Sequence, residues 1–314
     1  MDSVATAAYR QPMRIPDGIE HLAFRVALGG LRRLPYPAAE ACLRGAARLV
    51  GPLGGLRRRV VDDQLAAVYP ELPPTARRAL RAAVYDHLGR TAAEVFCADP
   101  RRLAGQVRIE PGWAALDRAL AGGRGAIVVT GHLGNFELGG RLLAARYPLL
   151  DVVKPQRNRA FERDLQRLRN RHGIATVPMD RAGRAVLAHL RRGGLVSLLV
   201  DQDAGAQGLG LDFLGRPAST WPGAARLALR TGCPVVPVAI LRRADGHVFH
   251  IGEAIGVEAQ RADAQQVAAL MRRISDGVES FVRTCPEQWF WVHRRWKGAA
   301  EAQRTDPHRK EPKV

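Results

Sequence analysis

The chain has 314 residues, 46% of them hydrophobic, which is enough to form the core of one large domain or two smaller ones. Its 48 lysines and arginines outnumber 30 acids, for a formal net charge of +18, and only four of the basic residues are lysines. This excess predicts an anionic partner such as membrane headgroups or a phosphorylated substrate, although coding bias would also enrich arginine. Nucleic acid is not favoured, because aromatic residues are sparse and no RNA-binding aromatic motif, zinc-finger spacing or basic zipper is present.

Residues 1–16 are polar and interrupted by prolines, which predicts a flexible tail. Residues 17–60 are expected to form amphipathic, membrane-associating helices, since an apolar stripe of Ile19, Leu22 and Val26 is followed by arginines and the pattern repeats once. Such helices lie in a membrane interface, or they simply pack on the protein core. No stretch approaches about 20 uninterrupted apolar residues, so an interfacial position is favoured over a spanning helix.

The next segments alternate in type up to a short buried strand. We expect helices at 56–69, 75–97 and 112–120, a strand at 107–110, and Thr75 as the N-cap of the second helix. Residues 127–129 form a β-branched run of the kind buried in a parallel sheet, and Thr130 and Gly131 end it with a turn. A helix is then expected from Asn135 onward.

Strands and helices continue to alternate to the end of the globular part. The expected strands are 149–153, 174–177, 195–200, 235–240 and 248–251, and the expected helices are 158–172, 182–192, 222–231 and 265–284. This order predicts an α/β fold with a mainly parallel central sheet and helices on both faces. We therefore expect one domain over residues 17–297 and a disordered tail over residues 298–314.

The turn after residues 127–129 carries the strongest signal for chemistry. His132 and Glu137 lie on this strand-to-helix turn, where the loop can bend the imidazole back onto the carboxylate. A histidine paired with a carboxylate can act as a general base with its orienting partner.

Three further clusters fall at strand ends or in the loops beyond them, where ligands of parallel sheets gather. Arg169 lies off the basic stripe of its helix, Asp201 and Gln202 end the purest strand pattern, and Thr220 is a plausible N-cap for the helix 222–231. A metal site at Asp201 and Asp203 is not favoured, because no histidine or third carboxylate stands at ligand spacing nearby.

Taken in order, these motifs resemble the bacterial lipid A biosynthesis acyltransferases (lauroyl/myristoyl type), a family that includes the phosphatidylinositol mannoside acyltransferases. The resemblance spans roughly residues 20 to 297. It rests on the His132-x4-Glu137 box, the Arg-Leu-Arg169 element, Asp201-Gln202 with Phe213-Leu214-Gly215 and Thr220-x-x-Gly223, and the ending Pro286-Glu-Gln-Trp-x-Trp-x-His293-Arg-Arg-x-Lys297.

The resemblance implies a glycerolipid-acyltransferase-like fold and the transfer of an acyl group from an acyl carrier protein or coenzyme A thioester to a hydroxyl of a lipid A precursor. His132 would take the hydroxyl proton and Glu137 would orient the imidazole. The Gly134 and Asn135 amides would hold the oxyanion. Arg169 would bind a phosphate of acceptor or donor, while Asp201, Gln202 and Thr220 would shape the acceptor site.

No metal or cofactor is expected beyond the acyl thioester, and no Gly-x-Ser-x-Gly motif for a seryl intermediate is present. The resemblance also implies a peripheral or shallowly inserted position on the cytoplasmic face of the bacterial inner membrane, with anionic lipids and a glycolipid acceptor as partners. Two alternatives stay open. The acceptor could be phosphatidylinositol mannoside or another glycerophospholipid, or the chain could be a non-enzymatic basic protein that binds membranes or nucleic acid.

Overall fold

The computed structural model describes residues 17–50, 57–261 and 263–299. The tail predicted at residues 1–16 and most of the tail predicted at 298–314 lie outside these described residues. Gly298, at the start of the second predicted tail, is described, and its backbone N–H donates to the Asp203 carboxylate over 2.9 Å.

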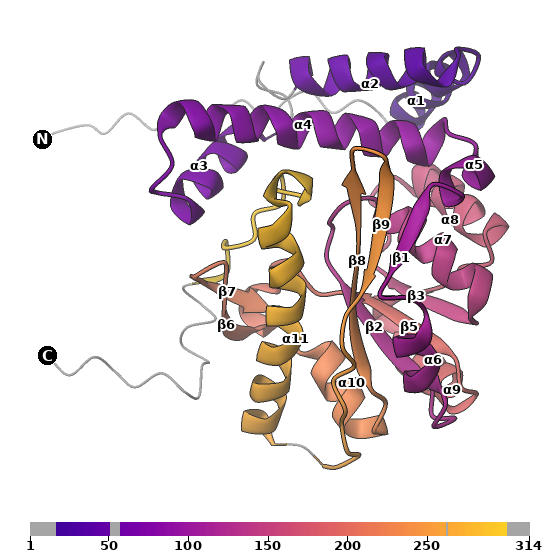
Figure 1. The fold of residues 1–314 in the computed structure, drawn as a ribbon, viewed down its shortest axis with the longest axis vertical. Coiled ribbons are helices and arrows are strands. Elements are labelled where there is room, and N and C mark those ends of the chain that lie inside the picture. The colour runs from indigo at the N-terminus through magenta and orange to yellow at the C-terminus, as the bar shows by residue number, and fades with distance from the viewer. Residues whose placement is uncertain (1–16, 51–56, 262, 300–314) are drawn as a thin grey trace, which may run out of the picture.

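One seven-stranded sheet forms the centre of the molecule (Figure 1). Its strands, in spatial order, are β1 (Val107–Glu110), β9 (Gly246–Ile251), β8 (Val235–Arg243), β2 (Ala126–Thr130), β5 (Leu195–Leu199), β3 (Leu149–Val153) and β4 (Ala175–Pro178). The five strands from β8 to β4 are parallel, whereas β9 runs antiparallel to β8. The predicted mainly parallel sheet is therefore confirmed. The reversal at β9 follows from the short turn between Arg243 and Gly246, which can join only antiparallel strands.

Helices cover both faces of the sheet, as predicted. Alternate residues of a strand point to opposite faces, so a continuously apolar strand presents apolar side chains on both sides, and helices pack on each. On one face Ile127 and Val129 pack with α9 (Ala182–Arg191), α10 (Gly223–Thr231) and α11 (Ala264–Thr284). On the other face Ala126 and Val128 pack with α6 (Ala114–Leu120) and α7 (Phe136–Arg146). The remaining helices of the sheet domain are α5 (Pro100–Ala104) and α8 (Arg159–Arg171).

The N-terminal helices gather at one end of the sheet, where α2 and α4 lie side by side (Figure 1). They are α1 (Asp17–Leu31), α2 (Tyr36–Val50), α3 (Arg58–Val68) and α4 (Pro74–Phe96). The contact between α2 and α4 is close at Gly89, where an added Cβ would lie 2.6 Å from the Arg44 Cα. The predicted cap at Thr75 is wrong, because the helix begins one residue earlier at Pro74, whose fixed φ suits the first helical position.

A two-stranded hairpin, which the sequence pattern did not reveal, occupies the glycine-rich segment after β5. It consists of β6 (Leu209–Phe213) and β7 (Arg216–Thr220), joined by a turn in which Leu214 and Gly215 both have positive φ. Thr220 pairs with Leu209 at the end of this hairpin. The predicted capping role of Thr220 is therefore wrong, since Pro222 occupies the N-cap position of α10.

Candidate active site

The predicted site residues come together because two neighbouring parallel strands end at the same level. Thr130 at the end of β2 is the register partner of Leu199 at the end of β5. The Val200 backbone N–H then donates to the Thr130 carbonyl over 3.0 Å. The loops that follow these strands carry His132 and Asp201, so the sheet delivers both side chains to one place, as expected for the carboxyl edge of a parallel sheet.

His132 and Asp201 form a hydrogen-bonded pair. The His132 Nδ1 lies 2.8 Å from Asp201 Oδ1, and the backbone N–H of His132 donates to Asp201 Oδ2 over 2.7 Å. The indole Nε1 of Trp289 donates to that same Oδ2 over 2.8 Å. Burial by itself would raise the pKa of Asp201, but the imidazole and these hydrogen bonds outweigh it and bring the pKa down to about 2. Asp201 is therefore a buried, ionised carboxylate.

This pairing selects the tautomer of the histidine. An ionised carboxylate only accepts hydrogen bonds, so Nδ1 of His132 carries the proton and Nε2 is unprotonated, with a lone pair that can accept a hydrogen bond. The Nε2 atom faces the side-chain amide of Gln202, whose Nε2 lies 3.3 Å away. Rings of Phe136 and Phe290 flank the imidazole, with centroids 5.2 and 5.9 Å from it. The His132 side chain stays 23% exposed, so its basic nitrogen is within reach of a substrate.

Glu137 does not occupy the position predicted for it against the imidazole. Its two carboxylate oxygens instead bind the guanidinium of Arg169, with Arg169 Nε 3.3 Å from Oε2 and the second bond between Nη2 and Oε1. Glu137 lies in the first turn of α7, which directs its side chain toward α8, whereas Asp201 arrives from the adjacent strand end. The expected partner of His132 is corrected to Asp201, and a catalytic role for Glu137 stays a prediction.

The Arg169 side chain is 13% exposed and is paired with Glu137. Its charge also acts on the nearby Asp151, where it partly offsets burial, and the pKa of Asp151 is raised overall to about 6. The ion pair with Glu137 joins α7 to α8 beside the turn that carries His132. Binding of a substrate phosphate by Arg169 stays a prediction.

Gly134 and Asn135 shape the turn that follows His132. The Gly134 backbone N–H donates to the Gln288 carbonyl over 3.0 Å, so this amide is already used and does not fit the predicted role toward an oxyanion. The turn also requires glycine, because φ is +60° and an added Cβ would lie 1.6 Å from the Ile240 carbonyl oxygen. Asn135 is buried, and its side-chain oxygen caps α7 by accepting from the Leu138 N–H over 3.0 Å.

Thr220 is fully buried and belongs to a set of contacts around Arg295, which sequence reasoning missed. The Arg295 guanidinium donates to Thr220 Oγ1 over 2.6 Å, to the Gln202 carbonyl over 3.2 Å and to the Ser219 carbonyl. Its burial lowers the pKa to about 10. By binding Arg295, which also binds the Gln202 carbonyl, Thr220 therefore helps to hold the loop that carries Gln202. The sequence signal for this arginine is its place in the C-terminal His293-Arg-Arg run of the family motif.

Asp203, the other acid considered for a metal site, is engaged with the protein. Its carboxylate accepts from the Gly205 and Gly298 backbone N–H groups over 3.2 and 2.9 Å. Across the described ranges, no group of three or more histidine, cysteine or acidic side chains is placed to hold a metal ion.

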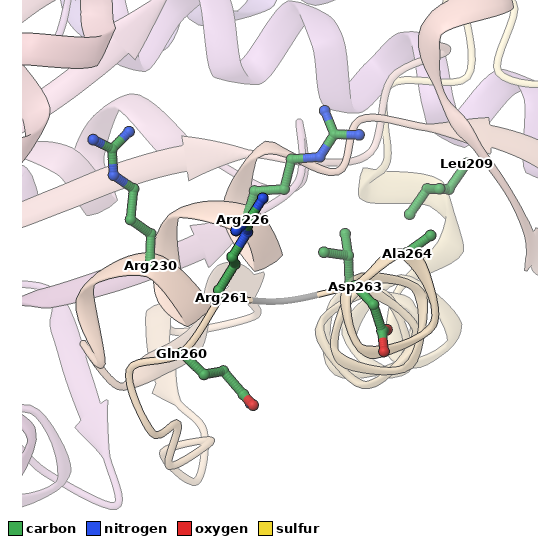
Figure 2. A pocket seen from close by; sticks show the side chains of 8 residues that line it. Leu209, Arg226, Arg230, Gln260, Arg261, Asp263 and Ala264 are labelled. Atoms are coloured by element: carbon green, nitrogen blue, oxygen red, sulfur yellow. The ribbon is translucent and has the colours of Figure 1, made fainter.

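A cavity of about 390 Å³ lies elsewhere, between α10 and the start of α11 (Figure 2). Figure 2 shows Arg226 reaching from α10 and Asp263 on the opposite wall. The lining residues are Leu209, Arg226, Arg230, Gln260, Arg261, Asp263, Ala264 and Val267. This cavity offers positive charge but no histidine base, so the pair at His132 is the better candidate reaction centre.

Comparison with known proteins matches residues 13–298 to the model of the bacterial lipid A biosynthesis acyltransferase family. The chain is 27% identical over 272 residues to a lipid A biosynthesis palmitoleoyltransferase of Escherichia coli, covering 84% of this chain and 87% of that protein. It is also 27% identical over 278 residues to a phosphatidylinositol mannoside acyltransferase of Mycobacterium tuberculosis, covering 85% of each. A lipid A biosynthesis lauroyltransferase of E. coli is 26% identical over 279 residues, covering 86% of this chain and 88% of that protein.

Proposed function

The chain belongs to the bacterial lipid A biosynthesis acyltransferase family and is an O-acyltransferase, and we propose that it transfers a fatty acyl chain from a thioester of an acyl carrier protein or coenzyme A to a hydroxyl of a lipid A precursor. The observation that carries this proposal is the hydrogen bond from His132 Nδ1 to the buried carboxylate of Asp201. It leaves Nε2 of His132 as an accessible base.

In the proposed reaction the lone pair on His132 Nε2 takes the proton of the acceptor hydroxyl as the hydroxyl oxygen attacks the thioester carbon. The carbonyl electrons move to oxygen and then return to expel the thiolate, so a C–O bond forms and the C–S bond breaks. The imidazolium gives its proton to the leaving thiolate, which restores the base. Asp201 stabilises the imidazolium charge throughout, because its carboxylate stays ionised beside Nδ1.

Two neighbouring groups are proposed to assist this step. Gln202 donates toward the lone pair of His132, so an acceptor hydroxyl would take its place and leave the amide beside the reacting atoms, where it can stabilise the oxyanion. Arg169 is proposed to contact a phosphate of the acceptor or donor, with Glu137 holding the guanidinium in place. No metal or organic cofactor enters this scheme. We also propose that the fold is of the glycerolipid acyltransferase type.

A phosphatidylinositol mannoside or another glycerophospholipid is the second candidate acceptor. It is favoured by the equal identity, 27%, to the E. coli palmitoleoyltransferase and to the mycobacterial phosphatidylinositol mannoside acyltransferase. Either acceptor would supply a hydroxyl, on a fatty acyl chain or on a sugar, in a lipid that carries phosphate, so the same base and the same arginine would serve either reaction.

Mass spectrometry of the lipids from a strain that lacks this protein would test the proposed acceptor. We expect one lipid A species to lose the mass of a single acyl chain, and the original species to return when the wild-type gene, but not a His132→Ala gene, is restored. Loss of an acyl chain from a phosphatidylinositol mannoside instead would identify the second acceptor. An unchanged lipid profile would contradict both.

The proposal includes attachment to the cytoplasmic face of the inner membrane, and helix α1 supports membrane attachment as such. Its inner side packs on α8, where His21 Nε2 lies 2.9 Å from Asp164 and the ring of Phe24 contacts that of Phe161. Its outer side presents Ile19, Leu22 and Val26, which are 59%, 63% and 68% exposed. None of the described helices is long and apolar enough to cross a membrane. From the exposed apolar side chains of α1 we propose that its outer side lies in the headgroup region of an anionic membrane.

We expect the purified protein to sediment with anionic vesicles at low salt and to be released as salt is added, because part of the attraction is electrostatic. The triple variant Ile19→Glu/Leu22→Glu/Val26→Glu should bind these vesicles at least about tenfold more weakly, since burying one large apolar side chain contributes about 1.5–3 kcal/mol. Met179→Glu is the control, because Met179 is 44% exposed on another part of the molecule. Equal binding by the triple variant would refute the α1 surface.

A further inference from the structure

Helix α4 places the buried carboxylate of Glu94 next to the turn that carries His132. Glu94 is 6% exposed and forms two hydrogen bonds with Arg242 of β8, from Nη2 to Oε2 over 2.6 Å and from Nε to Oε1 over 3.2 Å. His247 Nε2 of β9 lies 3.3 Å from Oε2. Burial would raise the pKa of Glu94, but His247 and Arg242 outweigh this and bring it down to about 2. The Glu94 carboxylate is therefore ionised inside the protein.

This carboxylate is bonded directly to the turn that carries His132. The Asn135 side-chain amide donates to Glu94 Oε2 over 2.8 Å, while the oxygen of the same amide caps α7. The two bonds use both ends of the amide, so they fix its orientation and its position. Asn135 is thereby held between α4 and α7, three residues after His132.

A second connection runs from Arg242 through His87. Burial and the charge of Arg242 lower the pKa of His87 to about 3, so this histidine is neutral. Arg242 Nη1 donates to His87 Nδ1 over 2.5 Å, which places the histidine proton on Nε2. His87 Nε2 lies 3.3 Å from the Gly134 carbonyl oxygen and donates to it. Gly134 and Asn135 are thus both linked by hydrogen bonds to the ion pair of Glu94 and Arg242.

A third connection reaches the turn through Gln288. The side chain of Gln288 exchanges two hydrogen bonds with the backbone of Arg242, over 2.8 and 2.9 Å. Its carbonyl accepts from the Gly134 N–H over 3.0 Å, and two residues later the Phe290 N–H donates to the His132 carbonyl over 3.0 Å. The Gly134 amide is therefore connected to Arg242 through Gln288, and the same C-terminal segment also binds the His132 carbonyl.

We propose that Glu94 is a positioning residue for acyl transfer, which holds the turn of His132 through Asn135 so that Nδ1 stays bonded to Asp201. The inference rests on the proposed role of His132 as the base. The competing interpretation is that Glu94 and Arg242 form an ordinary buried ion pair that stabilises the fold alone. A displacement of about 1 Å at a reacting group can cost about 10²-fold in rate, so the two interpretations differ in kcat rather than in stability.

Two matched double variants separate these interpretations. Both remove the buried charges together, because loss of one partner would leave an unpaired charge. In Glu94→Gln/Arg242→Met the side-chain amide oxygen at position 94 can still accept the hydrogen bond from Asn135. In Glu94→Met/Arg242→Met the side chain at position 94 has no acceptor for this hydrogen bond. Both lose the contact of Arg242 with His87. The buried Asn135 amide lacks this acceptor in the methionine pair, so a lower melting temperature is expected there, and both proteins are assayed well below their melting temperatures. Under these conditions we expect a kcat at least about tenfold lower for the methionine pair than for the glutamine pair, and KM values within about twofold.

Hydrogen exchange of the peptide spanning residues 131–138 gives a readout that needs no activity. Faster exchange is expected in the methionine pair than in the glutamine pair. If the exchange rates differ while kcat does not, Glu94 orders the turn without serving acyl transfer, which would overturn the proposal and leave the role of His132 to the separate test by His132→Ala. Equal exchange and equal kcat in the two pairs would overturn the positioning role.

Asn135→Ser provides the same test if the methionine pair does not fold. Serine retains the capping of α7 but is too short to reach Glu94. We expect its kcat to fall to the level expected for the methionine pair, with α7 retained by circular dichroism. A kcat equal to that of the wild type would overturn the proposal.

Discussion

His132→Ala is expected to lower kcat for acyl transfer by about 10²–10⁴-fold, which is the usual contribution of a general base. The side chain is 23% exposed on the loop that follows β2, and it contacts one carboxylate, one amide and two aromatic rings. Removal of the imidazole should therefore leave the fold intact. The measurement is the transfer rate with a thioester donor, and circular dichroism and the melting temperature serve as controls.

Retention of more than a few per cent of the wild-type rate in a folded His132→Ala protein would rule out His132 as the base. Loss of vesicle binding in the same variant would also count against the assignment, because membrane attachment is proposed to lie on α1. A chain that only bound membranes or nucleic acid would show no thioester consumption and no dependence on His132. That alternative is set aside here by the family to which the chain belongs.

Asp201→Asn is expected to have an effect of the same order as His132→Ala, a fall of about 10²–10⁴-fold in kcat with little change in KM. The amide is nearly the same size as the carboxylate and can still accept from Trp289 and from the backbone of His132. It carries no charge, however, so it cannot stabilise the imidazolium, and its N–H₂ group favours the wrong tautomer of His132. The decisive measurement is kcat at saturating donor and acceptor.

Glu137→Gln is the matched control, because it neutralises the other candidate carboxylate. In the structure Glu137 binds Arg169 and not the imidazole, so this variant should lose less kcat than Asp201→Asn and should change KM if Arg169 contacts substrate. The reverse order, with Glu137→Gln the slower enzyme, would favour Glu137 as the orienting partner. Each variant removes one negative charge, so a difference in kcat between them reflects the position of the carboxylate that was neutralised.

Features that are set by residues close together in the sequence could be predicted from the sequence alone. The runs at 127–129, 149–153 and 195–200 are apolar except for Asp151 and Ser197, which is typical of buried parallel strands, and the structure has strands at all three. His132 was singled out because it directly follows such a strand. The family was recognised from the order of its motifs along the chain, which needs no knowledge of the fold.

The identity of the carboxylate beside His132 required the tertiary structure. Glu137 is five positions away along the chain and was chosen for that reason, whereas Asp201 is separated from His132 by 69 positions. They meet because β2 and β5 are adjacent and parallel, and strand order leaves no trace in local periodicity. The contacts of Glu94 with Asn135 and of Arg295 with Thr220 likewise join distant segments. Hydrophobic pattern specifies which face of an element is buried, but only packing of the whole chain decides which polar side chains face one another.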